Sequence, residues 1–270
     1  MRPSHRYFFR PRPPASHRPL LIYFSGMDGS GQLLQAQLDE LATAFDVHCL
    51  MLPRDQRLDW AGLAAEVQAQ LLPLRHQGRV AGRSLYLCGE SFGGCLALQL
   101  AAQAPDCLDG LILVNPASSF HRLPLLKLAA PLSGWAPTEL YQAFTHLLLQ
   151  LLVEPGQVAP PERQRLLRAM QQLPAQTAHW RLSLLNQFVL DHAALARFEQ
   201  PVLILSSQGD RLLPSVEEGD RLLELFPQAS QVILPHSGHA CLLEQDISLL
   251  QLLEESNVLS NCAVSACAGL

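Results

Sequence analysis

Short apolar segments alternate with longer segments of helical periodicity from Leu20 to near the end of the chain. This pattern is typical of a parallel sheet covered by helices, because parallel strands need long crossovers and become buried on both faces. The apolar segments predict strands at residues 19–24, 47–52, 84–89, 108–115, 201–207 and 231–234. The periodic segments predict helices at about residues 32–45, 60–76, 91–104, 216–226 and 241–255. The expected fold class is α/β, with a mostly parallel sheet flanked by helices.

The alternation stops between about residues 120 and 198, where leucine-rich helical segments are separated by seven prolines and no strand pattern is visible. An all-helical insertion between two strands is what a lid over an active site looks like in a sequence. The alternative is a satellite core with no part in the site. The expected division is a basic Pro/Arg-rich N-terminal tail (1–18), a core (19–119 and 199–255), a helical cap (120–198) and a C-terminal tail (256–270).

Charge is unevenly distributed along the chain. Its 270 residues, within the range of one large domain, carry a formal net charge of −5, yet five arginines precede the first acidic residue, Asp28. The remainder is therefore more acidic, which argues against nucleic acid as a partner, because binding phosphates needs clustered Lys or Arg. The basic segment is expected to be a solvated tail, with a targeting or anionic-lipid-binding role as the alternative. No apolar run reaches about eighteen residues, so no membrane-spanning helix is expected, although peripheral membrane contact stays open.

The seven cysteines have neither the spacing of metal ligands nor the density of a disulfide framework. An odd number of scattered thiols fits a reducing compartment, and the expected localisation is cytoplasmic. No metal or other cofactor is predicted, and the protein is expected to be a monomer.

A serine stands between two glycines directly after the third predicted strand. Ser91 lies in the segment Gly-Glu-Ser-Phe-Gly-Gly of residues 89–94, which is followed by the helical pattern of residues 95–104. A sharp strand-to-helix turn forces such a serine into a strained backbone conformation, in which side chains two residues away on either side would clash. Gly89 and Gly93 remove those clashes. The motif alone is weak, but its strand, turn and helix context predicts that Ser91 is a nucleophile.

A serine hydroxyl needs a general base, and the base needs an acid that fixes its tautomer and stabilises its charged form. With a nucleophile elbow, these partners follow in the order acid, then histidine. Asp210 follows the strand at residues 201–207, and His239 follows the last strand. His236 stands closer to that strand end, whereas His239 comes after a flexible Ser-Gly pair. We therefore predict His239 as general base and Asp210 as its orienting acid; a turn aspartate that caps the next helix is the alternative for Asp210.

Acyl transfer also needs two backbone donors for the oxyanion of the transition state, and removal of one such donor costs roughly 3 kcal/mol. The amide of Phe92 is expected to be the first. The loop after the first core strand reads Ser-Gly-Met-Asp-Gly-Ser-Gly at residues 25–31, and Met27 is the best candidate for the second. Glycines such as Gly26 let this backbone approach the substrate. The alternative is a phosphate cradle, but the loop lacks a Gly-Lys-Ser/Thr ending and Asp28 would repel an anion.

With these residues placed, the chain resembles the hydrolase half of the phytyl ester synthase and diacylglycerol acyltransferase-like (esterase/lipase/thioesterase) family of plastids and their photosynthetic bacterial relatives. The resemblance runs from about residue 20 to residue 253. It is carried by segments 26–31 and 89–94, by Leu-Ile-Leu-Val-Asn-Pro-Ala (111–117), by Asp-Arg-Leu-Leu-Pro-Ser (210–215) and by Ser-Gly-His-Ala-Cys-Leu-Leu-Glu (237–244). It implies an α/β-hydrolase fold.

Two departures from that family are visible. Full-length plant members carry a second, acyltransferase-like domain where this chain ends. The resemblance therefore does not imply that this chain synthesises phytyl or glycerol esters. Large α/β hydrolases also begin with an antiparallel pair of strands, whereas about twenty Pro- and Arg-rich residues precede the first clear strand here. The sheet is expected to be shortened at that edge.

The expected reaction is hydrolysis of an ester or thioester of a hydrophobic acyl group through an acyl-serine intermediate. The leucines of the predicted cap supply the substrate clue, because each buried methylene contributes about 0.8 kcal/mol. The most aliphatic set is Leu125, Leu126, Leu128, Leu147, Leu148, Leu149, Leu151 and Leu152. Gly26, Leu148 and Leu212 are expected to contact the substrate.

Other functions remain open on the sequence. In an acyltransferase, a long-chain alcohol or a glyceride would replace water as the acceptor. A non-catalytic receptor for a hydrophobic ligand would not need the complete set of nucleophile, base and acid. Hydrolysis of carbon–carbon or carbon–halogen bonds is a further possibility, although the dehalogenase version normally has an aspartate where Ser91 stands.

Overall fold

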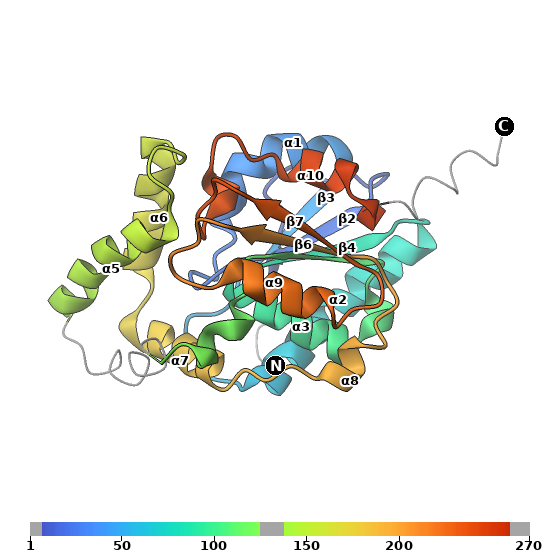
Figure 1. Cartoon of the computed structure of the whole chain (residues 1–270). Coiled ribbons are helices and arrows are strands. Elements are labelled where there is room, and N and C mark those ends of the chain that lie inside the picture. The colour runs from blue at the N-terminus through green and yellow to red at the C-terminus, as the bar shows by residue number, and fades with distance from the viewer. Residues whose placement is uncertain (1–6, 125–137, 260–270) are drawn as a thin grey trace.

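The computed structural model describes residues 7–124 and 138–259 (Figure 1). A seven-stranded sheet has the order β1-β3-β2-β4-β5-β6-β7, and every neighbouring pair is parallel except β1 with β3. The strands are β1 Phe8–Phe9, β2 Leu20–Phe24, β3 Asp46–Leu50, β4 Leu85–Glu90, β5 Gly110–Val114, β6 Val202–Ser207 and β7 Ala229–Leu234. The predicted α/β class and mostly parallel sheet are confirmed.

Helices cover both faces of this sheet. Figure 1 shows α1 and α10 on one face and α2, α3 and α9 on the other. Side chains alternate between the two faces along a strand: Leu20 and Ile22 of β2 join the core with α2 and α3, whereas Leu21 and Tyr23 join the core with α1 and α10. Burial on both faces explains why the strands read as continuous apolar segments. The helices are α1 Leu38–Ala44, α2 Trp60–Val80, α3 Phe92–Gln103, α9 Ser215–Leu223 and α10 Leu249–Glu255, with 3-10 turns η1 Gln32–Gln37, η2 Pro105–Cys107, η3 Ala117–Arg122, η4 Cys241–Leu243 and η5 Asn257–Leu259.

The predicted helix over residues 241–255 is wrong in its middle. The structure has the turn η4 and then α10, separated by the bridge residue Glu244 and a turn at residues 245–246. Glu244 forms an isolated antiparallel bridge with Val158, which pulls its backbone out of helical geometry. Ser248 then starts α10, because its side chain accepts a hydrogen bond from the amide of Gln251.

The prediction of a solvated tail over residues 1–18 is wrong for residues 7–9. Tyr7 is buried, and β1 pairs with the edge strand β3. The ring of Phe8 stacks on Phe24, with centroids 6.5 Å apart. The apolar triplet Tyr7-Phe8-Phe9 therefore anchors a segment whose arginines and prolines otherwise suggest a solvated chain. Residues 1–6 and 260–270 lie outside the described part.

The segment predicted as a cap is mostly helical where it is described, with turns and the bridge residue Val158 between its helices. It contains α5 Thr138–Leu152, α6 Pro160–Gln172, α7 Ala175–Asn186 and α8 His192–Leu195. Figure 1 shows α5 and α6 projecting beside the sheet, while α7 and α8 lie next to the α3 face. Large apolar side chains of α7 and the residues after it, such as Trp180 and Phe188, join the main core, whereas Leu149 and Leu166 form a small separate cluster with Ala240 and Leu243.

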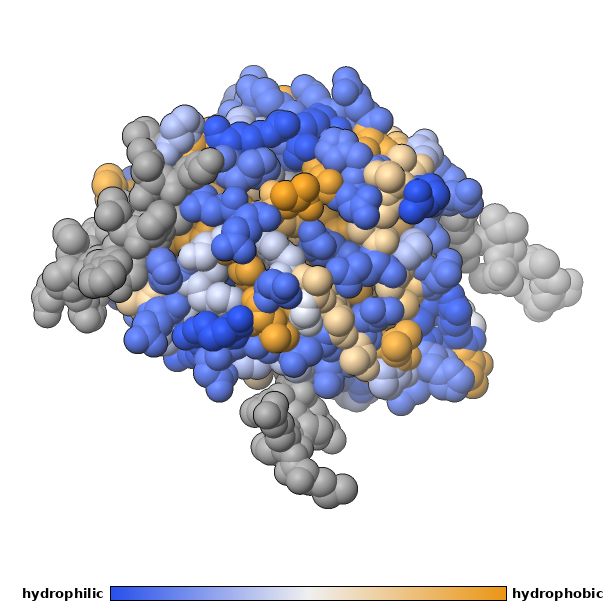
Figure 2. Space-filling view, turned by 90° about the horizontal axis from the view of Figure 1, so that it is seen from below, coloured by the Kyte–Doolittle hydropathy of each residue, from blue (hydrophilic) through white to orange (hydrophobic). Residues whose placement is uncertain are grey.

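The described ranges contain no candidate for a membrane-spanning helix. None of their helices combines the length and the apolar character that crossing a membrane requires. Figure 2 shows polar side chains over most of one face, with apolar residues between them.

Candidate active site

Ser91 occupies a sharp turn between β4 and α3. Its backbone has φ 53° and ψ −115°, a conformation that non-glycine residues rarely adopt. Its amide donates to the carbonyl of Val114 at 3.0 Å, and its own carbonyl accepts from the amides of Gly94 and Ala117, both at 3.0 Å. The neighbouring strand β5 and the turn after it thus hold the strained residue in place.

The two glycines that flank Ser91 are required by close backbone contacts. A Cβ on Gly93 would lie 2.1 Å from the carbonyl oxygen of Phe24, and a Cβ on Gly89 would lie 2.6 Å from the carbonyl oxygen of Gly93. Both distances are too short for any side chain. The clashes inferred from the sequence are therefore present in the structure.

The structure brings Ser91, His239 and Asp210 together. Nε2 of His239 lies 2.9 Å from Oγ of Ser91, and Nδ1 of His239 lies 2.6 Å from Oδ2 of Asp210. All three side chains are buried: Ser91 is 8% exposed, and the side chains of His239 and Asp210 are 4% and 1% exposed. A carboxylate at Nδ1 favours the tautomer in which Nε2 can accept the hydroxyl proton. His236, the alternative base, is exposed to solvent.

Asp210 is held by hydrogen bonds to both carboxylate oxygens. Oδ1 accepts from the amides of Leu212 and Leu213 at 2.8 and 3.0 Å. Oδ2 accepts from the hydroxyl of Ser215 as well as facing His239. Asp210 therefore bonds the turn ahead of α9 while it faces His239, but it does not cap that helix, whose N-cap residue is Pro214. The contribution of Ser215 was not predicted.

The electrostatics of the pair favour a charged carboxylate beside a protonatable imidazole. Burial alone would raise the pKa of Asp210, but the charge of His239 and the hydrogen bonds from His239, Ser215 and Leu213 lower it below its ordinary value. Burial alone would lower the pKa of His239, but Asp210 and, more weakly, Glu90 raise it. The two shifts are opposite, because each charged form stabilises the other, as expected for one coupled pair.

The loop that carries His239 is braced by Asn115, which sequence reasoning treated only as part of a motif. Asn115 follows β5 with φ 41°. Its side-chain nitrogen donates to the carbonyl of His239 at 2.8 Å, and its side-chain oxygen accepts from the amide of Ser207 at 2.8 Å. Leu152, at the end of α5, adds a further contact, because its carbonyl accepts from the amide of Ala240 at 2.8 Å. His239 is thus held in place by residues at strand ends and by the cap segment.

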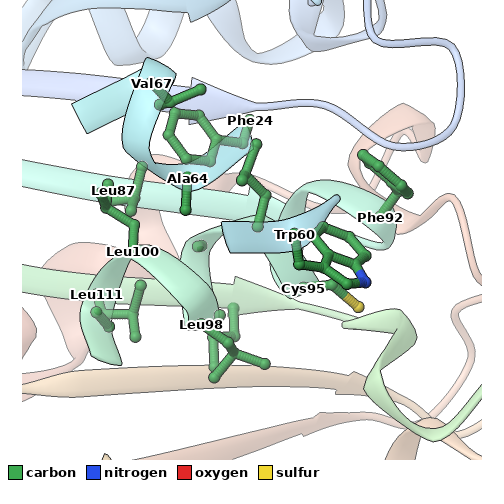
Figure 3. Packing of buried hydrophobic residues seen from close by; sticks show 14 of the residues in the cluster. Phe24, Trp60, Ala64, Val67, Leu87, Phe92, Cys95, Leu98, Leu100 and Leu111 are labelled. Carbon is green, nitrogen blue, oxygen red and sulfur yellow. The ribbon is translucent and has the colours of Figure 1, made fainter. Parts of the chain in front are cut away.

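Phe92 and the loop of Met27, which are predicted to supply the oxyanion donors, both lie next to Ser91. Phe92 is the first residue of α3, and its ring is fully buried against Trp60, with centroids 5.0 Å apart (Figure 3). A Cβ on Gly26 would lie 3.5 Å from Cβ of Ser91 and 4.0 Å from its Oγ, so the loop of Gly26 and Met27 passes directly beside Ser91. Met27 is half-buried.

The leucines predicted to contact the substrate have not been brought next to Ser91 in the way that His239 and Asp210 have. Leu148 is half-buried in α5, and Leu212 is half-buried against the main core. Leu125, Leu126 and Leu128 lie outside the described residues.

Two cavities border the cap segment, but neither is lined by Ser91, His239 or Leu148. One of about 680 Å³ lies between the segment of Phe9, the turn η1 and α6. Another of about 480 Å³ lies between α5 and α6. The described cavities therefore do not connect the nucleophile to Leu148.

Glu90 is a second buried acid near the base, and the sequence reading passed over it. Its carboxylate accepts a hydrogen bond from the hydroxyl of Tyr23. Burial raises its pKa to about 7, against the lowering effect of Tyr23 and His239. In its ionised form, Glu90 in turn contributes to the raised pKa of His239.

We expect Glu90→Gln to move the acidic limb of the kcat/KM profile to lower pH. The reaction requires His239 unprotonated, and removing one of the negative charges that raise the pKa of His239 lets that pKa fall toward its ordinary value. Activity near pH 7 should rise relative to the plateau, whereas well below that pH Glu90 is already protonated, since its pKa is about 7, and the variant should differ little from wild type. Tyr23→Phe, which removes a bond that lowers the pKa of Glu90, should shift the limb in the same direction by less. A limb that stays in place in Glu90→Gln would contradict this electrostatic role.

Comparison with known proteins agrees with this geometry. The family model described as alpha/beta hydrolase fold matches residues 79–246. Phytyl ester synthase 1, chloroplastic, of Arabidopsis thaliana is 34% identical over 89% of this chain, which spans 37% of the length of that relative. Pimeloyl-[acyl-carrier protein] methyl ester esterase of Nitrosomonas europaea is 28% identical over 87% of this chain and 95% of its own length.

Solved structures share the architecture. A thermophilic esterase from Thermogutta terrifontis superposes with a TM-score of 0.73 at 21% identity, covering 88% of each chain. The resemblance to phytyl ester synthases inferred from the sequence motifs is confirmed, and the fold matches that of an esterase. The chain therefore belongs to the α/β-hydrolase fold family.

Proposed function

We propose that this protein is a serine hydrolase that cleaves an ester or thioester of a hydrophobic acyl group. The observation that carries the proposal is a series of two hydrogen-bonding contacts at the strained turn. Oγ of Ser91 lies 2.9 Å from Nε2 of His239, and Nδ1 of His239 lies 2.6 Å from Oδ2 of Asp210. A base within hydrogen-bond reach of a hydroxyl, itself oriented by a buried carboxylate, is the arrangement that activates a serine.

The reaction proceeds in two half-reactions. Oγ of Ser91 attacks the carbonyl carbon while Nε2 of His239 takes the hydroxyl proton, and the amides of Phe92 and Met27 stabilise the oxyanion. Collapse of the tetrahedral intermediate breaks the bond to the alcohol or thiol, which leaves with the proton from His239. Water then attacks the acyl-serine by the same route, and the carboxylic acid and free Ser91 are the products.

The hydrophobic acyl group is supported by the cap segment and by the relatives. The helix α5 joins the site, because Leu152 bonds to Ala240 next to the base and Leu149 packs with Ala240 and Leu243. Two curated relatives are named as an ester synthase and an ester esterase. The likeness to the synthase also favours a second candidate, acyl transfer to an alcohol, in which the acceptor replaces water in the second half-reaction.

Turnover of substrates with increasing acyl-chain length tests the proposal. Wild-type protein is given p-nitrophenyl esters and acyl thioesters from two to sixteen carbons, with and without a long-chain alcohol, and the products are separated. Free acid in both cases supports hydrolysis, whereas a new alcohol ester that displaces the acid supports acyl transfer. Binding of the longer esters without any release of p-nitrophenol or thiol would favour a non-catalytic receptor.

We expect Leu148→Gln to weaken long-chain esters more than short ones. Losing contact with two or three methylenes, each worth about 0.8 kcal/mol, should lower kcat/KM about ten- to fiftyfold on long chains and leave acetyl esters nearly unchanged. Leu147→Gln is the matched control, since Leu147 is in the same stretch but 60% exposed. Equal loss on acetyl and long-chain esters in a folded Leu148→Gln protein would mean that this leucine supports the scaffold.

We further propose a reducing location such as the cytoplasm. The cysteines in the described part of the chain, namely Cys49, Cys88, Cys95, Cys107 and Cys241, are all free thiols in buried positions.

A further inference from the structure

A buried arginine from the cap segment reaches the loop beside the nucleophile. Arg181 lies on α7 and has no exposed surface. Burying a guanidinium is costly unless its charge and its donors are met by partners. The identity of those partners therefore indicates why an arginine stands here.

The guanidinium binds the loop that carries the predicted second oxyanion donor. Nη1 of Arg181 donates to the carbonyl of Met27, and Nη2 lies 3.5 Å from the carbonyl of Leu52. The amide of Leu52 in turn donates to the carbonyl of Gly29 at 2.9 Å. The residues around Met27 are thus tied to the segment after β3 both directly and through the guanidinium.

The same guanidinium also lies beside the first predicted donor. Its central carbon is 5.8 Å from the centroid of the Phe92 ring, within the range of a cation–π contact. Arg181 therefore touches both residues whose amides are assigned to the oxyanion, although they come from different parts of the chain.

The loop is shaped to this side chain. Gly29 has a φ of +60°, and a Cβ placed on it would lie 2.4 Å from Nη1 and 2.6 Å from Nη2 of Arg181. A glycine is needed here both for the backbone conformation and for the close approach of the guanidinium. Burial raises the pKa of the adjacent Asp28, and the hydrogen bonds from Ser30 and the charge of Arg181 oppose that rise.

We propose that Arg181 is a positioning residue for the oxyanion hole. Through this side chain, the position of α7 determines where Met27 and Phe92 lie. The inference rests on the proposed hydrolase function of Ser91. A donor placed before the reaction stabilises developing charge without reorganisation, so a displacement of this loop lowers the rate of the chemical step. Binding of the substrate in its ground state depends on the loop much less.

Other contacts hold α7 in place without Arg181. The indole of Trp180 donates to the carbonyl of Leu58 at 3.0 Å, and the indole of Trp60 donates to the carbonyl of Leu184 at 2.7 Å. Arg181 variants are therefore expected to keep the helix docked, and their defect should lie in the site.

The first test compares Arg181→Met with Arg181→Lys. We expect Arg181→Met to lower kcat about ten- to hundredfold, below the loss of a direct oxyanion donor, with KM within about threefold of wild type. Arg181→Lys should recover part of the rate, because an ammonium can bond one carbonyl but lacks the planar fork that spans two. Arg75→Met is the matched control: this arginine is also buried and pairs with Asp109, so its loss should lower Tm with kcat unchanged.

The second test changes the loop residue that contacts Arg181, and it remains informative if the Arg181→Met protein fails to fold. Gly29→Ala should lower kcat with little change in KM, whereas Gly82→Ala, with a similar φ of +66° and no neighbour within 4 Å, should only lower Tm. In the Arg181→Lys background, Gly29→Ala should cost less than in wild type, since both changes disturb one contact. Strictly additive losses would overturn the proposal.

The outcomes separate this inference from the proposed function. Turnover that persists in Ser91→Ala would remove the hydrolase mechanism itself. Turnover that depends on Ser91 but is unchanged in kcat in folded Arg181→Met protein would overturn only the role of Arg181. An equal fall of kcat in Arg181→Met and Arg75→Met would likewise overturn it, since burial of any arginine would then explain the effect.

Discussion

Replacing Ser91 with alanine is expected to abolish covalent labelling by a fluorophosphonate probe and to lower kcat/KM on an activated ester by about four to six orders of magnitude. The reason is the position of its Oγ, 2.9 Å from Nε2 of His239 at a buried turn. Without that oxygen, no acyl-enzyme forms, and water must attack the substrate directly in the remaining oxyanion site.

Loss of labelling and turnover identifies Ser91 as the nucleophile only if the Ser91→Ala protein still folds. Alanine keeps the Cβ of Ser91, so the strained turn and the hydrogen bonds of its backbone to Val114 and Ala117 are retained. Tm should therefore stay close to that of wild type. Ser119→Ala is a suitable control, because Ser119 in η3 also carries a buried hydroxyl and has no assigned role in the catalytic hydrogen bonds. Labelling that survives in Ser91→Ala would place the nucleophile elsewhere.

Much of the fold was predictable because burial leaves a regular trace in the sequence. Strands buried on both faces, such as β2 and β4, read as continuous apolar segments with helical patterns between them. The positions of Ser91, Asp210 and His239 were predictable because each follows a strand end, and strand ends of a parallel sheet meet along one edge. The pattern of glycines at residues 89 and 93 added the local constraint of the turn.

The errors have the opposite cause, since they depend on contacts between distant segments. Arg181 and Met27 are 154 positions apart, and Asn115 and His239 are 124 positions apart. No periodicity links such pairs, so the bracing of the site by α7 and by Asn115 was not predicted. The break in the helix predicted over residues 241–255 arises in the same way, from the bridge between Glu244 and Val158.

We expect Asp210→Asn to lower kcat by about four orders of magnitude with the fold intact. The contacts of Asp210 determine how the amide would be oriented. Its Oδ1 accepts from the amides of Leu212 and Leu213, and only an oxygen can take that place. The amide nitrogen of asparagine must then occupy the position of Oδ2 and donate toward Nδ1 of His239.

That orientation would force the wrong tautomer. With Nδ1 accepting, the imidazole proton moves to Nε2, which can no longer take the proton of Ser91. Loss of the carboxylate also removes the charge that most strongly opposes the effect of burial on the pKa of His239. That pKa should fall, so the acidic limb of the kcat profile should move to lower pH while the plateau drops.

Companion variants separate the catalytic hydrogen bonds from their surroundings. His239→Ala should lose as much activity as Asp210→Asn, and the double variant should lose little more, because the residues act as one unit. His236→Ala, at the exposed position three residues earlier, should change kcat by less than about twofold. Ser215→Ala removes one of the donors to Oδ2 and should cost about tenfold or less. Steady-state kinetics over pH 5 to 9, with Tm measured on each protein, decides the assignment. A folded Asp210→Asn protein with near wild-type kcat would show that Asp210 has been given the wrong role. A His236→Ala protein that alone is inactive would show the same for His239.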